Sequence, residues 1–146
     1  MGIFSAMDIS SSGLSAQRLR MDVISRNIAN ANVTRTASGT PYRRQVAVMR
    51  EIKGNDFESY LKNSLSKNYS GGVEVVAVVD DMSDFKMHYD PSHPDANKDG
   101  YVLMPNVDTV TEMVNMISAS RAYEANITSI NNAKSMALKA LEIGSK

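Results

Sequence analysis

The longest apolar pattern in the chain lies in its last third, between Asn106 and Lys146. This stretch contains no proline, and its only glycine is Gly144. Its apolar residues recur at seven-residue steps in two neighbouring rows, Met116, Tyr123, Ile130 and Ala137 in one and Met113, Ile127 and Leu141 in the other. Ser120 and Lys134 interrupt the second row. A repeat of this kind predicts one long helix with a narrow apolar seam.

This helix is too long for a compact domain of 146 residues. At about 1.5 Å per residue, about 35 residues form a rod of roughly 50 Å. A compact chain of this length has an expected radius of gyration of about 15 Å, which gives a diameter near 40 Å. The helix is therefore expected to project or to pack against other chains. Asn106 or Asp108 is expected to cap its start, where Glu112 also suits the positive end of the helix dipole.

A second helical pattern runs from Ile3 to about Ala31. Its apolar residues fall on two adjoining rows, Met7, Leu14, Met21 and Ile28 on one and Ile3, Ile24 and Ala31 on the other. Ser10 and Gln17 occupy the second row, and the segment from Ser10 to Gly13 is poor in helix formers. We therefore predict a frayed or broken helix there and a firm helix from about Leu14 to Asn30. The stripe fits packing within one domain and packing in an inter-chain bundle equally well.

Three asparagines, Asn27, Asn30 and Asn32, lie at the end of this second pattern. Asparagine favours helix ends because its side chain competes for backbone hydrogen bonds. A helix stop is therefore predicted, followed by a polar loop over residues 34–41.

The middle of the chain changes to a period of two. Alternation over Tyr42–Ile52, a β-branched run over Val73–Val79 and alternation over Phe85–Tyr89 predict three short strands. Helical spacing in residues 57–65 indicates a short helix or a folded loop. Asp90–Gly100 is dense in turn residues, and Tyr101–Pro105 is expected to continue extended. The predicted fold class is α+β, with a small antiparallel β insert between long terminal helices.

Composition narrows the range of functions. Sixteen basic residues balance sixteen acidic ones, so the net charge is zero and the electrostatic footprint of a nucleic-acid binder is missing. Zero net charge also favours contact between copies. Cysteine is absent, which excludes disulfides and cysteine nucleophiles. The first residues lack the pattern of a cleavable signal peptide, and no apolar run reaches the length of a membrane span.

Candidate chemistry is sparse. Asp95, Asn97, Asp99 and Gly100 match the first half of a calcium loop, but Asn106 stands where a bidentate glutamate is required. His88 and His93 lack a third zinc ligand placed by secondary structure. An ordinary Asp/Asn/Gly turn is the expected structure. We predict no catalytic site, no cofactor, no small-molecule substrate and no metal.

Several segments resemble those of bacterial flagellar rod and hook proteins. Residues 12–17 and 27–32 are similar to the N-terminal signature of that family, and residues 118–127 are similar to its C-terminal helix. Residues 90–108 resemble its proximal rod branch in particular, whereas residues 53–70 match least well. The resemblance implies a structural subunit of the proximal rod, which spans the periplasm, transmits torque and encloses the export channel.

The resemblance further implies that residues 1–34 and 106–146 form a discontinuous, coiled-coil-like polymerisation domain and that residues 35–105 form a small β-rich middle domain. Expected partners are copies of the chain, other rod proteins and the flagellar type III export apparatus, and nucleic acid is not among them. The predicted assembly residues are Leu14, Met21, Ile24, Asn27, Ile28, Asn30, Met113, Met116, Ile117, Tyr123, Ile127, Ile130, Leu138 and Leu141. The alternative is a soluble helical adaptor or chaperone that binds a partner helix.

Overall fold

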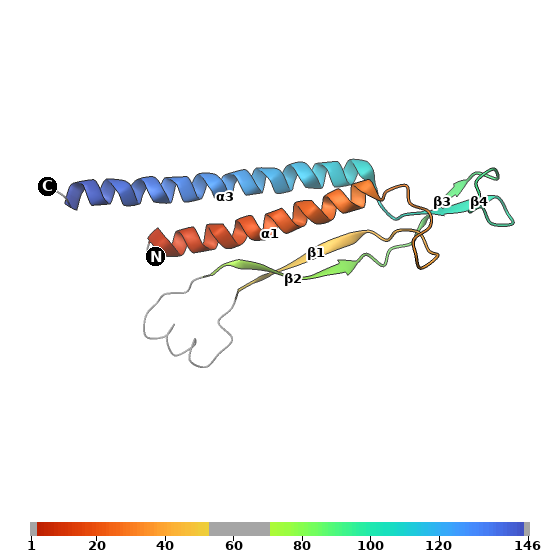
Figure 1. Cartoon of the computed structure of the whole chain (residues 1–146), viewed down its shortest axis with the longest axis horizontal. Helices are drawn as coiled ribbons and strands as arrows, with labels where there is room; N and C mark the ends of the chain where they lie inside the picture. The colour runs from red at the N-terminus through yellow and green to blue at the C-terminus, as the bar shows by residue number, and fades with distance from the viewer. Residues whose placement is uncertain (1–2, 53–70, 145–146) are drawn as a thin grey trace, which may run out of the picture. The chain divides into compact units, whose positions relative to one another are not determined.

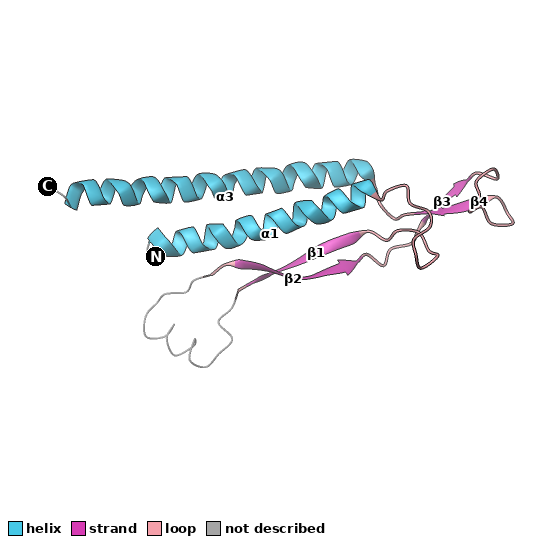
Figure 2. Ribbon diagram, in the orientation of Figure 1, coloured by secondary structure: helices cyan, strands magenta, loops and turns pink. Residues whose placement is uncertain are grey.

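The computed structural model describes residues 3–52 and 71–144, which form two long helices separated by short strands (Figure 1). Helix α1 comprises Ile3–Ala29, and helix α3 comprises Thr109–Gly144. The strands are β1 (Gln45–Glu51), β2 (Val73–Asp80), β3 (Lys86–Tyr89) and β4 (Tyr101–Met104). Figure 2 shows the helical ends of the chain and the β structure between them. The predicted α+β class is confirmed.

Helix α3 is continuous over 36 residues, as the apolar repeat predicted. Asp108 caps its start, because one carboxylate oxygen accepts hydrogen bonds from the backbone N–H groups of Val110 (3.0 Å) and Thr111 (3.3 Å). At about 1.5 Å per residue the helix is roughly 54 Å long. Of the two predicted caps, Asp108 is the one that the structure uses.

Helix α1 continues without interruption through Ser10–Gly13, so the predicted break is wrong. The Ser12 hydroxyl donates a hydrogen bond to the backbone oxygen of Ile9 (2.7 Å) and accepts one from the backbone N–H of Val73 (3.1 Å) at the start of β2. The Ser15 hydroxyl likewise donates to the backbone oxygen of Ser11 (3.2 Å). Tertiary contacts therefore outweigh the low helix propensity of this segment.

Helix α1 ends where the asparagine cluster predicted a stop. The Asn30 side chain donates a hydrogen bond to the backbone oxygen of Arg26 (2.8 Å), and the chain then turns, with the Val33 N–H bonded to the Asn30 oxygen (3.1 Å). The Arg26 oxygen also accepts a hydrogen bond from the Asn30 backbone N–H (3.1 Å), so Asn30 bonds this carbonyl group twice at the end of the helix.

The strands form two separate two-stranded sheets, β1–β2 and β3–β4. In the first, the Ile52 N–H donates to the Gly72 oxygen and the Asp81 N–H to the Arg44 oxygen, so β1 and β2 run antiparallel. In the second, β3 and β4 are antiparallel, with Lys86 opposite Met104 and Tyr89 opposite Tyr101. The antiparallel insert is confirmed, with a fourth strand where the sequence predicted only extended chain. The pattern in residues 57–65 lies outside the described residues.

By its contacts the chain divides into two compact units. The first unit comprises the described parts of Met1–Leu19, Met49–Val76 and Ala119–Lys146, and the second comprises Arg20–Val48 and Ala77–Ser118. Both cores are small: the buried apolar residues are Ala16, Ala119 and Ala133 in the first unit and Val23, Ile24, Val102 and Val107 in the second. The sequence predicted a different division, with residues 1–34 and 106–146 as a polymerisation domain and residues 35–105 as a middle domain. That division stays a prediction. Neither described helix is long and apolar enough to cross a membrane.

Candidate assembly interface

In the first unit, α1 and α3 approach each other over small residues. The Ser10 hydroxyl donates to the Ser129 hydroxyl (3.1 Å), and a Cβ atom added to Gly13 would lie 2.9 Å from the Asn126 side-chain nitrogen. Ser10 faces Ser129 while the later Gly13 faces the earlier Asn126, so the two helices are antiparallel there. Small side chains at such a contact let two helix backbones come close together.

The buried row of α3 is therefore not the row with the largest apolar side chains. Glu112, Ala119 and Ala133 are buried at seven-residue steps or multiples of them. The predicted row from Met116 to Ala137 flanks this buried row and is only half-buried. The sequence thus predicted the helix correctly. Small and polar residues beside the predicted seam make the contact within the chain, and the role of the seam in assembly stays a prediction.

The predicted assembly residues fall into three groups by exposure. The exposed group, all on α3, is Met113, Ile117, Ile127, Leu138 and Leu141. The half-buried group is Leu14, Met21, Ile28, Asn30, Met116, Tyr123 and Ile130. Ile24 and Asn27 are buried inside the second unit, so they support the fold of the chain itself and are not available surface. For the first two groups, a role in assembly stays a prediction.

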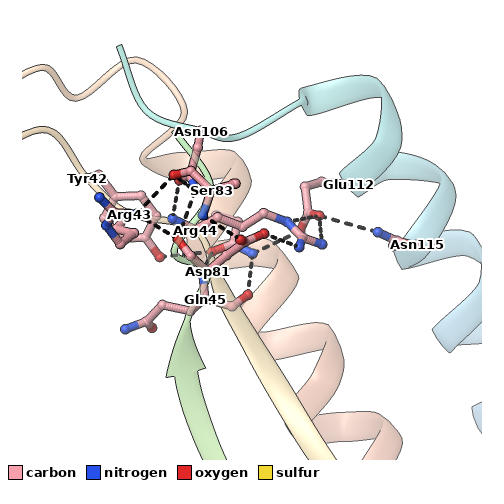
Figure 3. A network of polar contacts seen from close by, with 10 residues as sticks. Tyr42, Arg43, Arg44, Gln45, Asp81, Ser83, Asn106, Glu112 and Asn115 are labelled. Carbon is pink, nitrogen blue, oxygen red and sulfur yellow. Dashed lines mark hydrogen bonds and ion pairs between the residues drawn. The ribbon is translucent and has the colours of Figure 1, made fainter. Parts of the chain in front are cut away.

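Asn27 is buried and takes part in a polar network of the second unit. Figure 3 shows this network from close by, with Arg44 and Glu112 among the labelled residues. The Asn27 side-chain nitrogen donates to the Gln45 backbone oxygen (2.9 Å) and to Glu112 Oε2 (2.9 Å). Its side-chain oxygen accepts from the Gln45 N–H (2.9 Å) and from the Tyr42 hydroxyl (3.0 Å). All four hydrogen-bonding positions of the amide are filled. One side chain thereby joins α1 to the start of β1 and to α3.

Glu112 lies in the first turn of α3 and is fully buried. Its Oε1 accepts hydrogen bonds from Arg44 Nε (3.0 Å), Arg44 Nη2 (2.8 Å) and Asn115 Nδ2 (3.3 Å). A buried carboxylate is tolerated only when it is paired and hydrogen-bonded. The positive end of the α3 dipole also favours a negative charge here, as the sequence predicted.

Arg44 extends the network to the segment after β2. Its Nη1 donates to Asp81 Oδ2 (3.1 Å), and its backbone N–H donates to Asn106 Oδ1 (2.8 Å). Burial alone would lower the pKa of the Arg44 guanidinium, but hydrogen bonds and charge from Glu112 and Asp81 outweigh burial and raise it. Hydrogen bonds from Ser83, with a further one from Arg44, lower the pKa of the Asp81 carboxyl.

Two further contacts extend the network. The Asn106 side chain donates to the Asp81 backbone oxygen (2.9 Å), and the Arg43 guanidinium lies 4.3 Å from the centre of the Phe85 ring. Burial raises the pKa of the Tyr42 phenol, so the hydroxyl that donates to Asn27 remains protonated at neutral pH. These groups hold the fold together and are not arranged for a reaction.

The loop that resembled half of a calcium site is an asparagine turn. Asn97 Oδ1 accepts from the N–H groups of Asp99 (2.9 Å) and Tyr101 (2.9 Å), and Gly100 has a φ of 79°. Asp95 accepts a hydrogen bond from the Thr34 hydroxyl (2.9 Å) and pairs with Arg35 (3.6 Å). Within residues 3–52 and 71–144, no group of three or more His, Asp or Glu side chains is arranged to hold a metal ion.

Comparison with known proteins gives matches at both ends of the chain and along its length. The family model described as flagella basal body rod protein matches residues 7–35, and the one described as flagellar basal body rod FlgEFG protein C-terminal matches residues 98–143. These segments include most of α1 and α3.

Three relatives that match almost the whole chain carry the same name. The flagellar basal-body rod protein FlgC of Borreliella burgdorferi is 49% identical over 149 residues, covering 98% of each chain. The protein of the same name from Bacillus subtilis is 47% identical, and that from Salmonella typhimurium is 40% identical, each covering 99% of both chains. The similarity includes the middle segment as well as the terminal helices.

Proposed function

Because this chain belongs to the FlgC family of flagellar basal-body rod proteins, we propose that it builds the rod by polymerising through α1 and α3. The chain is a structural subunit of the rod in the flagellar basal body and not an enzyme. Its assembly partners are copies of itself and other rod proteins. The comparisons do not support the alternative of a soluble adaptor or chaperone.

An exposed apolar stripe on α3 carries this proposal. Val110, Met113, Val114 and Ile117 follow the i, i+3, i+4, i+7 spacing of one helix face, and each is at least 47% exposed. The stripe is turned away from the buried Glu112, because successive residues are about 100° apart around a helix. An amphipathic helix normally buries such a face, and neighbouring subunits provide the surface that does so here.

The polar network suits a subunit that transmits torque. Asn27, Arg44 and Glu112 join both helices to the start of β1 through hydrogen bonds of 2.8–3.0 Å between buried or part-buried groups. Directional bonds of this kind resist sliding of one element past another better than apolar contacts do. The helices form the tube that encloses the export channel, and residues 35–105 form the outer part.

Delivery to the rod takes place through the flagellar type III export apparatus. The absence of cysteine suits a chain that is exported unfolded into an oxidising space. The small buried cores of both units also suit export in the unfolded state, because little side-chain packing has to be disrupted before export.

An aspartate at an apolar position of each helix tests the polymerisation. Ile127→Asp, at a side chain 39% exposed on α3, is expected to abolish rods and motility. Burying an unpaired carboxylate between subunits costs about 2 kcal/mol or more at every contact. Leu14→Asp is expected to do the same from α1.

The matched controls are Thr128→Asp and Ser15→Asp, at exposed polar positions next to the test sites. Each adds the same charge to the same helix and is expected to leave motility intact. Motility assays and electron microscopy of isolated basal bodies provide the measurement. Normal rods in both Ile127→Asp and Leu14→Asp would refute assembly through these helices.

A further inference from the structure

A histidine holds one turn of the loop that joins β3 to β4 (Figure 1). His93 Nδ1 accepts a hydrogen bond from the backbone N–H of Asp95 (3.1 Å). We propose that protonation of His93 opens this turn and releases the Asp95 carboxylate from the segment that follows α1. All of these residues belong to the second unit, so the inference concerns contacts within one chain and goes beyond the proposed polymerisation.

The position of His93 in this turn is one that asparagine and aspartate usually occupy. Their side-chain oxygen accepts a hydrogen bond from the backbone N–H two residues further along the chain. In the same loop, Asp90 Oδ1 accepts from the Ser92 N–H (3.1 Å) and Asn97 Oδ1 from the Asp99 N–H (2.9 Å). His93 makes the equivalent bond with a ring nitrogen. Histidine is the side chain whose charge ordinarily changes between pH 5 and 8, so a mild change of pH acts on this turn.

Protonation removes the acceptor on which the turn depends. A ring nitrogen that accepts a hydrogen bond carries no proton, whereas both nitrogens of the imidazolium are donors. Once His93 is charged, its Nδ1–H and the Asp95 N–H face each other, and the ring has to rotate out of the turn. The His93 side chain is only half-buried, so protons reach it from the solvent.

Asp90 favours the rotated, charged ring. Hydrogen bonds from Ser92, followed by the positive charges of His93 and His88, hold the pKa of the Asp90 carboxyl below its usual range. Asp90 is therefore an anion throughout the pH range in which histidine titrates, and it attracts a charged His93. Loss of the acceptor and attraction by Asp90 act in the same direction, because both draw the ring away from the Asp95 N–H.

Asp95 joins the loop to the segment after α1. Its Oδ2 accepts a hydrogen bond from the Thr34 hydroxyl (2.9 Å), and its Oδ1 lies 3.6 Å from Arg35 Nη1. These three residues line a pocket of about 380 Å³, to which Tyr101 also contributes. A charged His93, two residues away in the chain, competes with Arg35 for the Asp95 carboxylate. Protonation therefore weakens the link between the two segments at this pocket.

Amide hydrogen exchange, measured by NMR on the full chain at pH 7 and pH 5, tests the switch. After correction for the intrinsic exchange rate at each pH, the protection of the Asp95 amide should fall about tenfold at pH 5, because one hydrogen bond contributes about that factor to an equilibrium constant. The Arg35 Nε–H resonance should move with the same midpoint as the His93 ring resonances. The Gln45 amide, which donates to Asn27 in the polar network, should keep its protection.

Two histidine variants assign the titration. His93→Asn keeps an oxygen acceptor for the Asp95 N–H and cannot be protonated in this range, so its Asp95 amide should stay protected at pH 5. His88→Asn is the matched control, because it makes the same substitution at an exposed position on β3. It should show the same tenfold loss at Asp95 as the unmodified chain.

Three results would overturn the inference. The first is equal protection of Asp95 at pH 7 and pH 5 in the unmodified chain, which decides the matter whether or not His93→Asn folds. The second is a loss that persists in His93→Asn, and the third is a loss that disappears in His88→Asn, since each assigns the titration to a group other than His93. These measurements involve no rods, so the proposed polymerisation is tested separately.

Discussion

At the scale of single residues, Asn27 joins more parts of the second unit than any apolar side chain of the core could. Its amide pairs with both backbone groups of Gln45 and with the side chains of Glu112 and Tyr42. The Asn27 amide donates to the Gln45 backbone oxygen and accepts from the Gln45 backbone N–H, as a residue of a neighbouring strand would. Asn27 on α1 therefore takes the place of a strand partner beside Gln45. A buried polar group that is fully satisfied fixes position more strictly than packing alone.

Loss of this amide is expected to be costly. Asn27→Leu should lower the free energy of unfolding by about 3 kcal/mol, because the Gln45 backbone groups and Glu112 stay buried without their partner. Urea unfolding followed by circular dichroism measures the change. Asn30→Ala removes a single bond to the Arg26 oxygen and should cost less than about 1 kcal/mol. Equal losses in the two variants would contradict the assigned role of Asn27.

The cap of α3 makes stability depend on pH. Hydrogen bonds from the Thr111 and Val110 N–H groups lower the pKa of the Asp108 carboxyl below its usual value of 3.8. This stabilisation is therefore present above the unfolded pKa and is lost as the pH falls through the folded pKa. At neutral pH, Asp108→Ala should lower the urea midpoint, whereas Asp108→Asn keeps an oxygen acceptor and should change it little.

As the pH falls, the urea concentration at the midpoint of unfolding should decrease more for the unmodified chain than for Asp108→Asn. The reason is that the carboxyl group can be protonated and the amide cannot. The comparison is made at a series of pH values from about 6 to about 3. Parallel curves for the two proteins would show that Asp108 contributes nothing to the pH dependence.

At the scale of elements, the contact between α1 and α3 in the first unit depends on Gly13. Alanine at this position would gain up to about 1 kcal/mol of helix propensity, but its Cβ would lie 2.9–3.2 Å from atoms of the Asn126 side chain. The two effects oppose each other, so Gly13→Ala alone is expected to change thermal stability little. In the background of Asn126→Ala, where the obstruction is removed, the same substitution should stabilise by about 1 kcal/mol.

The full double-mutant cycle isolates the interaction between the two sites. Thermal unfolding of the four proteins gives the coupling energy, which is expected to be positive because removing the Asn126 side chain makes room for the new methyl group. Additive effects would show that the helices do not meet at Gly13.

Sequence patterns predicted the helices and strands well because each depends on local periodicity. They failed at Ser10–Gly13, since low helix propensity there is offset by Ser129, Val73 and Asn126, which lie far along the chain. The polar network was missed for the same reason: Asn27 and Glu112 are 85 residues apart and Arg44 and Glu112 are 68 apart. A local sign of it was Asn27 itself, an amide that follows the apolar Val23 and Ile24 by one helical turn.

At the scale of the whole molecule, the chain leaves much apolar surface uncovered. Its buried apolar residues, among those described, are three alanines, three valines and one isoleucine, whereas many larger side chains from Val110 to Ile143 are exposed. The net charge is zero, so repulsion does not keep copies apart. Under the proposed polymerisation, neighbouring subunits cover this apolar surface.

Hydrogen exchange should therefore differ along each helix. In the dilute monomer, the backbone amides near the start of α1 and the end of α3 are expected to exchange quickly, because little apolar burial holds them. The amides of residues 20–29 and 109–118 should exchange slowly, since the network of Asn27 and Glu112 anchors them. In assembled rods both sets should be protected, because ordering of the helix ends is then coupled to binding. Mass spectrometry of the exchanged chain resolves the segments, and strong protection of both helix ends in the dilute monomer would show that the helices are complete before assembly.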